Sequence, residues 1–159
     1  MPLILSGDTG VPASGMPTGS VIQTVNASTA TAVTSSTNTF IDTGLTATIT
    51  PMFATSKILV LVSQNGLNKS AAASTTCMDI LLLRNGTSLL SPNAIGAALE
   101  TGTTITNNVE GSICYLDSPA TTSALTYKTQ FCSRNNGASV SVQYANISNS
   151  TITLMEIKQ

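Results

Sequence analysis

Several residue types that support catalysis are scarce or missing in this sequence. It contains no histidine and no tryptophan, and aromatic residues make up 4% of the chain. Histidine is the commonest general base and the commonest protein metal ligand, so Ser-His and Cys-His nucleophile systems are excluded. Sugar-binding clefts usually recruit aromatic side chains for stacking, and these too are few. The expectation is a protein that is not an enzyme and that carries no cofactor and no metal.

Charge is also scarce. Charged residues make up 8% of the chain, against about 25% in ordinary soluble domains, and the net charge is −1. The six Lys and Arg residues are scattered singly, so no basic surface for a phosphate backbone is expected, and neither is nucleic-acid binding. No apolar run approaches the length of a membrane-spanning helix, and the first residues lack the positive region of a signal peptide. Synthesis in a cytoplasm without membrane insertion is expected.

The three cysteines show no metal-ligand spacing. Cys77, Cys114 and Cys132 each stand beside an apolar or aromatic residue. Because a free cysteine behaves as a small apolar side chain, we expect all three to be buried thiols.

Two apolar runs dominate what is present. Residues 57–66 and residues 78–86 each contain an unbroken apolar stretch and end in Asn-Gly, a strong turn signal. Such runs predict strands buried on both faces. In a two-layer sandwich only one face of a strand meets the opposing sheet, so a neighbouring subunit is expected to cover the other face, or alternatively a local loop. The expected core and subunit interface consist of Ile58, Leu59, Val60, Leu61, Val62, Ile80, Leu81, Leu82 and Leu83.

Short alternating segments surround these runs. Residues 45–50 alternate apolar residues with Thr, and residues 126–133, 140–144 and 151–157 show similar patterns between turn signals. Eight to ten short strands predict an all-β fold, a jelly-roll-like antiparallel β-sandwich. We expect residues 20–159 to form this head domain.

Residues 1–19 carry repeated Gly and Pro and predict an extended N-terminal arm. Its apolar residues Leu3, Ile4 and Leu5 are candidates for anchoring to a partner, with a frayed terminus as the alternative. Two long segments, 67–76 and 91–111, are rich in small residues and are expected to be exposed, partner-facing loops. The candidate residues in them are Asn68, Lys69, Ser70, Thr75, Thr103, Thr104, Asn107 and Asn108.

One motif suggests catalysis. Asp-Thr-Gly occurs at residues 8–10 and 42–44, and aspartic proteases use two such carboxylates that share a proton. The first copy lies in the Gly/Pro arm, and Leu45 follows the second where a small residue is expected. A turn that leads into the next strand explains Asp42-Thr43-Gly44 better.

Several blocks of the sequence resemble a known group of proteins. Residues 1–11 (MPLILSGDTGV), 17–23 (PTGSVIQ), 40–51 (FIDTGLTATITP), 56–62 (SKILVLV), 115–120 (YLDSPA) and 150–157 (STITLMEI) resemble structural modules of tailed-bacteriophage virions, common in phages of aquatic bacteria. The resemblance spans most of the chain and carries no catalytic or binding motif. It implies a β-sandwich head on the virion, assembled in the host cytoplasm and forming a homotrimer.

The resemblance leaves two interpretations close together. In the first, the chain is a short tail fibre or fibre tip whose arm binds another virion protein and whose loops meet a host receptor, either glycan or protein. In the second, it is a capsid decoration protein that stabilises the head shell. A secreted lectin-like module is a third interpretation, which the missing export signal and the few aromatic residues disfavour.

Overall fold

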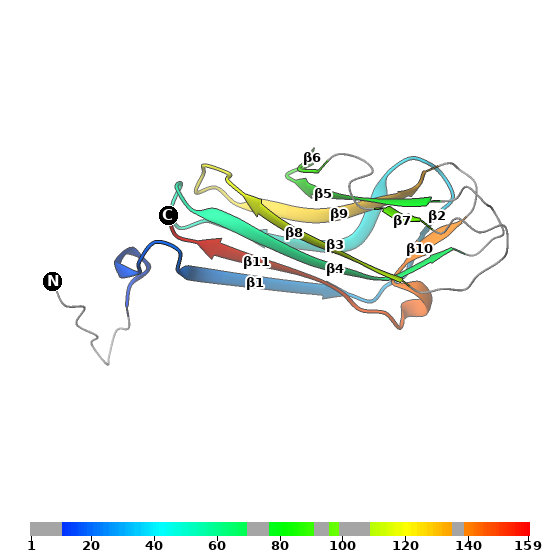
Figure 1. The fold of residues 1–159 in the computed structure, drawn as a ribbon, viewed down its shortest axis with the longest axis horizontal. Coiled ribbons are helices and arrows are strands. Elements are labelled where there is room, and N and C mark those ends of the chain that lie inside the picture. The colour runs from blue at the N-terminus through cyan, green and yellow to red at the C-terminus, as the bar shows by residue number, and fades with distance from the viewer. Residues whose placement is uncertain (1–10, 70–76, 91–95, 99–108, 135–138) are drawn as a thin grey trace.

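The computed structural model describes residues 11–69, 77–90, 96–98, 109–134 and 139–159. They form two antiparallel β-sheets packed face to face, which confirms the predicted all-β sandwich (Figure 1). The strands are β1 (Val21–Thr29), β2 (Val33–Ser35), β3 (Ile41–Ile49), β4 (Lys57–Lys69), β5 (Cys77–Arg84), β6 (Thr87–Ser88), β7 (Gly96–Ala98), β8 (Val109–Asp117), β9 (Leu125–Ser133), β10 (Val140–Val142) and β11 (Ser150–Ile157). Two short 3-10 helices, η1 (Ala13–Gly15) and η2 (Tyr144–Asn146), accompany them.

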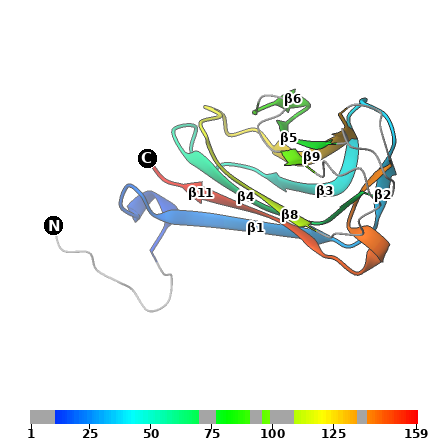
Figure 2. The ribbon, with the colours of Figure 1, turned by 45° about the vertical axis from the view of Figure 1, so that its right-hand side comes forward.

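The strand order is that of a jelly roll. Sheet I has the order β1-β11-β4-β10-β2, and β8 pairs with the other edge of β4. Sheet II has the order β3-β9-β5-β6, and β7 also pairs with β5. The long strands β1, β3, β4, β5, β8, β9 and β11 alternate between the sheets in chain order, so the chain wraps around its own core (Figure 2).

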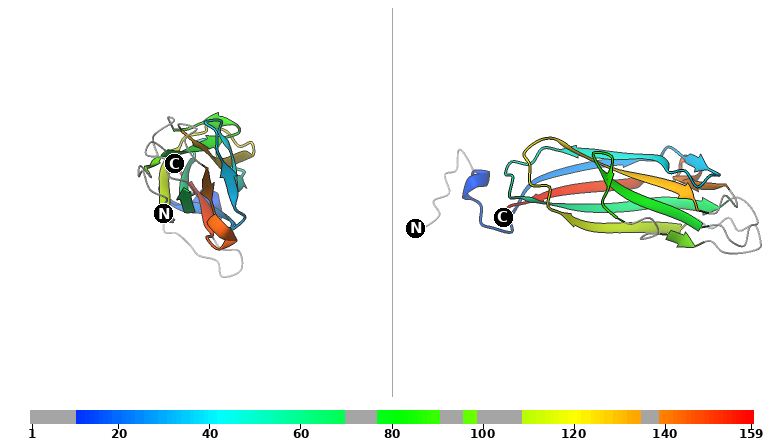
Figure 3. Two further views of the ribbon diagram at one scale, coloured as in Figure 1. Left: turned by 90° about the vertical axis from the view of Figure 1, so that its right-hand side faces the viewer. Right: turned by 90° about the horizontal axis from the view of Figure 1, so that it is seen from above.

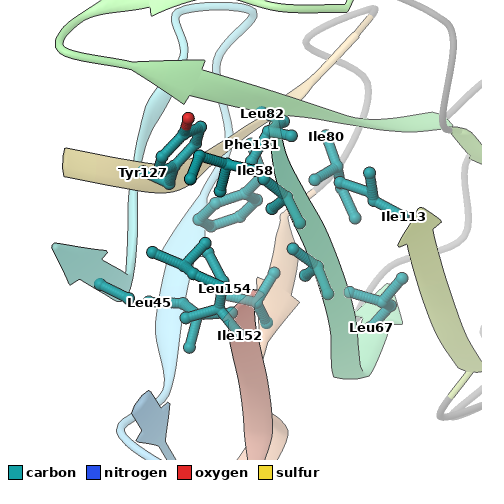
Figure 4. Close-up of a cluster of buried hydrophobic side chains, with 14 of the residues drawn as sticks. Leu45, Ile58, Leu67, Ile80, Leu82, Ile113, Tyr127, Phe131, Ile152 and Leu154 are labelled. Carbon is teal, nitrogen blue, oxygen red and sulfur yellow. The ribbon is translucent and has the colours of Figure 1, made fainter. Parts of the chain in front are cut away.

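The core lies between the two inner faces. Alternate apolar residues of both sheets point into it, including Leu45, Ile58, Phe131 and Leu154, each at most 1% exposed (Figure 4). In β3, Leu45, Ala47 and Ile49 are buried and the intervening residues are exposed, as the alternation predicts. Each fully buried aliphatic side chain contributes roughly 1.5–3 kcal/mol.

The two long apolar strands differ in burial. In β4, the side chains of Ile58, Val60 and Val62 are buried, whereas Leu59 and Leu61 are half-buried on the outer face of sheet I. Within a single chain the outer face of β4 is therefore only partly covered, and the expected cover by a neighbouring subunit stays a prediction. In β5, every residue from Cys77 to Leu83 is buried, as predicted.

The two Asn-Gly pairs also differ. Asn85 and Gly86 have positive φ angles and form the predicted two-residue turn between β5 and β6. Asn65-Gly66 does not end its strand, because β4 continues to Lys69 through a bulge between Gln64 and Leu67. Before this bulge β4 pairs with β11, and after it β4 pairs with β10. The bulge thus changes the partner strand instead of reversing the chain.

The molecule has two distinct ends (Figure 3). Residues 11–19 and the C-terminus lie at one end, which we call the terminal end. At the opposite end, which we call the distal end, β4 and β9 finish and β5, β8 and β10 begin.

Candidate functional site

The terminal end binds the chain segment that precedes the sandwich. The Nζ atom of Lys158 donates hydrogen bonds to the backbone oxygens of Ser14 (2.6 Å) and Met16 (2.5 Å), and it lies 5.8 Å from the ring centroid of Phe53. The Gly19 amide donates to the Lys158 oxygen, and the Lys158 amide donates to the Ser20 oxygen. This part of the expected arm therefore contains a 3-10 turn and lies against the C-terminal strand. The anchoring candidates Leu3, Ile4 and Leu5 lie outside the described residues.

A buried carboxylate joins two loops at the same end. Glu156 is fully buried, and its Oε1 accepts hydrogen bonds from the amides of Met52 (2.8 Å) and Phe53 (3.2 Å). Its Oε2 accepts one from Gln23. Hydrogen bonds to a charged acceptor are stronger than those between neutral groups, so Glu156 fixes the β3–β4 loop that carries Phe53.

The distal end corrects two predictions. Asn68 and Lys69 are the last residues of β4 and are 1% and 2% exposed, so they are not part of an exposed loop. The reason is the bulge, which lets β4 extend beyond Gly66 and pair with β10. The segment 91–111, expected to be a loop, contains β7 and the start of β8. The remaining candidates in these two segments lie outside the described residues: Ser70, Thr75, Thr103, Thr104, Asn107 and Asn108.

A chain of buried polar side chains crosses the core toward the distal end. The hydroxyls of Thr43 and Thr129 lie 2.6 Å apart, and Thr129 donates to Gln64 Oε1 (2.9 Å). The Oγ of Ser150 lies within hydrogen-bond distance of Gln64 Nε2, Gln143 Nε2 and the Asn65 amide. All five side chains in this chain are 0–1% exposed. They join the two sheets, and the Asn65 bond holds the bulge in place.

Near the bulge, the surface has an open depression of about 580 Å³ lined by Asn65, Gly66, Val109, Glu110 and Ser148. Next to Gly66, the backbone around η2 adopts left-handed angles, with φ of 49° at Gln143, 58° at Ala145 and 59° at Asn146. These residues hold η2 and the following loop against the Gly66 bulge.

One ion pair closes the open edge of the sandwich. Arg84 Nη1 lies 2.8 and 2.7 Å from the two carboxylate oxygens of Asp117, and the Tyr127 hydroxyl donates to the same carboxylate at 2.7 Å. Asp117 belongs to sheet I, whereas Arg84 and Tyr127 belong to sheet II. Burial of the Tyr127 hydroxyl, together with its bond to Asp117, raises the pKa of this tyrosine far above its ordinary value.

The Asp-Thr-Gly motif at residues 42–44 forms a bulge in β3. Gly44 has a φ of 84°, and Thr43 belongs to the buried polar chain. Asp42 is exposed and paired with Lys128, and its pKa is lowered by hydrogen bonds from Lys128 and Gln130. A carboxylate stabilised in its charged form is unlike the shared-proton pair of an aspartic protease. The other copy, at residues 8–10, lies outside the described residues.

The cysteines follow the prediction in part. Cys77 and Cys132 are buried free thiols, as expected, and burial raises the pKa of Cys132. Cys114 is exposed, because it faces outward on β8, an edge strand of sheet I. Asp79 pairs with Arg134 on the outer face of sheet II. Over the described ranges, no three His, Cys, Asp or Glu side chains are grouped so that they could hold a metal ion.

Sequence reasoning missed the buried polar residues. These residues are of types that usually face solvent, so residue type alone does not mark them as buried. Strand alternation is the signal that could have found four of them, because Thr43, Gln64, Thr129 and Ser150 lie in phase with the buried apolar residues of their strands. A separate finding concerns membranes: across the described segments, no helix is long and apolar enough to cross one.

Comparison with known proteins gives a distant structural likeness. No family model matches the chain, and no curated protein matches its sequence. Among solved structures, the VP2 subviral particle of infectious bursal disease virus matches with a TM-score of 0.44 and 13% sequence identity. The alignment covers all of this chain and 42% of the VP2 chain.

Proposed function

We propose that this chain is a structural protein of a tailed-phage virion, a short tail fibre or fibre tip without catalytic activity. The N-terminal arm attaches the sandwich to the particle, and the distal end contacts the host surface. The phage assignment rests on the sequence blocks that resemble virion modules. The assignment of attachment to one end and host contact to the other rests on the difference between the two ends of the fold.

This difference between the two ends is the observation that carries the proposal. Lys158 binds the backbone of Ser14 and Met16 at the terminal end, so the arm leaves the sandwich beside the C-terminus. The segment that joins β1 to β3 and the η2 turn before β11 lie at the distal end, the far tip of an elongated molecule (Figure 3). A head anchored at one end and presenting loops at the other suits attachment, because loops on a rigid scaffold often carry recognition.

Immunogold labelling of purified particles with antibody against this chain tests the proposal. Gold at the tail end is the expected result, and host-cell binding by the purified protein is then the next assay. Gold over the head would replace the fibre assignment with a capsid decoration protein. Absence of label on intact and on disrupted particles would refute a virion role and return attention to a secreted lectin-like module.

A second experiment tests the arm. Removing residues 1–15 leaves the strands and the core unchanged, so the truncated protein is expected to fold and to form the same oligomer. It is expected to lose binding to particles assembled without this protein. Particle binding at the wild-type level by the truncated protein would show that attachment depends on another surface.

A further inference from the structure

We infer that the outer face of sheet I is the surface through which copies of this chain pack together, around an axis parallel to the strands. The inference rests on the proposed function and deepens it, because a head attached to a particle by its arms suits an oligomer whose arms all leave from one end. It names the surface that forms the oligomer.

The register defines this face. Three successive rows run across β1, β11, β4 and β8, and each row places four outward side chains next to one another. These rows are Thr24-Met155-Leu59-Leu116, Asn26-Thr153-Leu61-Cys114 and Ser28-Thr151-Ser63-Ser112. At the terminal end a further pair, Val21 and Ile157, adds to the apolar part, and both Val21 and Leu116 are 48% exposed. The face is thus apolar near the terminal end and covered by small hydroxyl and amide side chains farther on.

None of these twelve row positions is charged. Rotation about an axis parallel to the strands brings the same residues of each copy together at the axis. Identical charges at such positions would repel each other, so a face that meets itself in this way must be neutral near the axis. The nearest charged residues on this face are Lys57 and Glu110, at its two ends. The pattern therefore fits a second copy of the same chain.

The outer face of sheet II lacks these properties. It carries the ion pairs Lys128–Asp42 and Arg134–Asp79, and its apolar residues Leu81 and Leu83 are already 7% and 6% exposed within a single chain. Little apolar surface remains there for a partner. Of the two outer faces, sheet I is the one that gains from being covered.

The size of the face is adequate. Four strands about 4.8 Å apart and about eight residues long at 3.4 Å per residue cover a plane of roughly 500 Å². Side chains that project from the plane increase the accessible area toward the roughly 800 Å² per partner that a stable interface buries. A parallel axis also keeps every arm at the terminal end and every distal end on the opposite side, which a particle-bound head requires.

The test combines a charge substitution with a cross-link. Leu116→Glu places a carboxylate on a half-exposed position, so each chain still folds, but in the oligomer the covered face leaves that charge desolvated and without a partner. The dissociation constant is expected to rise about 100-fold or more. Thr48→Glu is the matched control, because it adds the same charge to an exposed β3 position on the outer face of sheet II. Sedimentation equilibrium of both variants and of the wild type measures the effect.

For the cross-link, Leu61→Cys is made in a Cys114→Ser background, where Cys77 and Cys132 are buried. Under mild oxidation, covalent dimers are expected from Leu61→Cys and not from Thr48→Cys in the same background. With three-fold symmetry the yield is expected to reach about two thirds of the chains, since a third thiol has no partner.

The outcomes separate this inference from the proposed function. Dissociation by Leu116→Glu alone, with cross-linking at position 61, supports it. A wild-type oligomer that tolerates Leu116→Glu and does not cross-link at position 61 would place the interface elsewhere and overturn the inference, while gold labelling still decides the virion role. A wild-type monomer at micromolar concentration overturns the inference as well, again without bearing on the position of the gold.

Discussion

Replacing Gly66 with alanine tests the role assigned to the β4 bulge. Gly66 has a φ of 62°, and a Cβ atom there would lie 2.6 Å from the Tyr144 amide nitrogen and 2.7 Å from Ser148 Cβ. A left-handed conformation costs a non-glycine residue about 1–2 kcal/mol. The close contacts add about 1–3 kcal/mol, because the Tyr144 amide is backbone and cannot move aside as a flexible side chain would. The expected loss of unfolding free energy is about 2–5 kcal/mol.

Gly86→Ala provides the matched control. Gly86 also has a positive φ, 84°, but nothing lies within 4 Å of the added Cβ. Its cost is therefore the conformational part alone, about 1–2 kcal/mol. The difference between the two variants isolates the contact of the bulge with Tyr144 and Ser148.

Urea denaturation of both variants at one protein concentration measures this difference. With a slope of about 1–3 kcal/mol per molar urea, a 3 kcal/mol difference moves the midpoint by about 1–3 M. Adding Ser148→Gly to Gly66→Ala removes two of the three close atoms and is expected to recover part of the loss. If Gly66→Ala were within about 0.5 kcal/mol of Gly86→Ala, the contact at the bulge would have no energetic weight and the reasoning would be refuted.

Three further predictions concern the side-chain contacts. Because the pKa of Tyr127 is raised in the folded protein, its neutral hydroxyl stabilises the fold fully below the unfolded-state pKa of about 10, and this stabilisation is lost as pH rises above that value. Between pH 9 and pH 11 the free energy of unfolding should therefore fall less in Tyr127→Phe than in wild type, as urea midpoints will show. Thr43→Val and Thr129→Val should be non-additive by about 0.5–3 kcal/mol in a double-mutant cycle of unfolding free energies, and additivity would mean that their 2.6 Å contact is not a coupled bond. Lys158→Met should speed proteolytic cleavage near Ser14 without changing the urea midpoint by more than about 1 kcal/mol, whereas equal cleavage rates would show that Lys158 does not hold the arm.

The sequence predicted the class of fold because its signals are local. Alternation in residues 45–50 and 151–157 reports which side chains face the core, and the structure buries those side chains. The turn at Asn85-Gly86 depends only on the positive φ angles that these two residues tolerate. Signals of this kind need no knowledge of the rest of the chain.

The predictions that were wrong depend on distant residues. Asn65-Gly66 is locally a turn signal like Asn85-Gly86, yet here the Asn65 amide bonds to Ser150 and the strand continues. Likewise, Asn68 and Lys69 are buried because β10, more than 70 residues later in the chain, pairs with them. No pattern around residue 66 contains this information.

The predictions about partner-facing residues also divide into those with local signals and those that depend on distant residues. Whether a residue is exposed at the distal end depends on which strand extends farthest there, and that depends on the pairing of β4 with β10. The arm segment 11–19 is easier to anticipate, since Gly and Pro spacing alone predicts a segment outside the sheets. Its contact with Lys158, in contrast, joins residues 144 positions apart and has no local signal.

The strands β4 and β5 have the same kind of apolar run but differ in how far their outer faces are buried. Both strands contain unbroken apolar runs, and such runs indicate that both faces are covered. For β5 the chain itself supplies the cover, since Leu81 and Leu83 on the outer face are buried without any partner. For β4 the described chain supplies only part of the cover: Leu59 and Leu61 stay half-buried, and Leu59 lies opposite Leu116, which is 48% exposed. Exposed apolar area costs about 25 cal/mol per Å², so we infer that the signal satisfied within the chain at β5 is satisfied at β4 by a second copy.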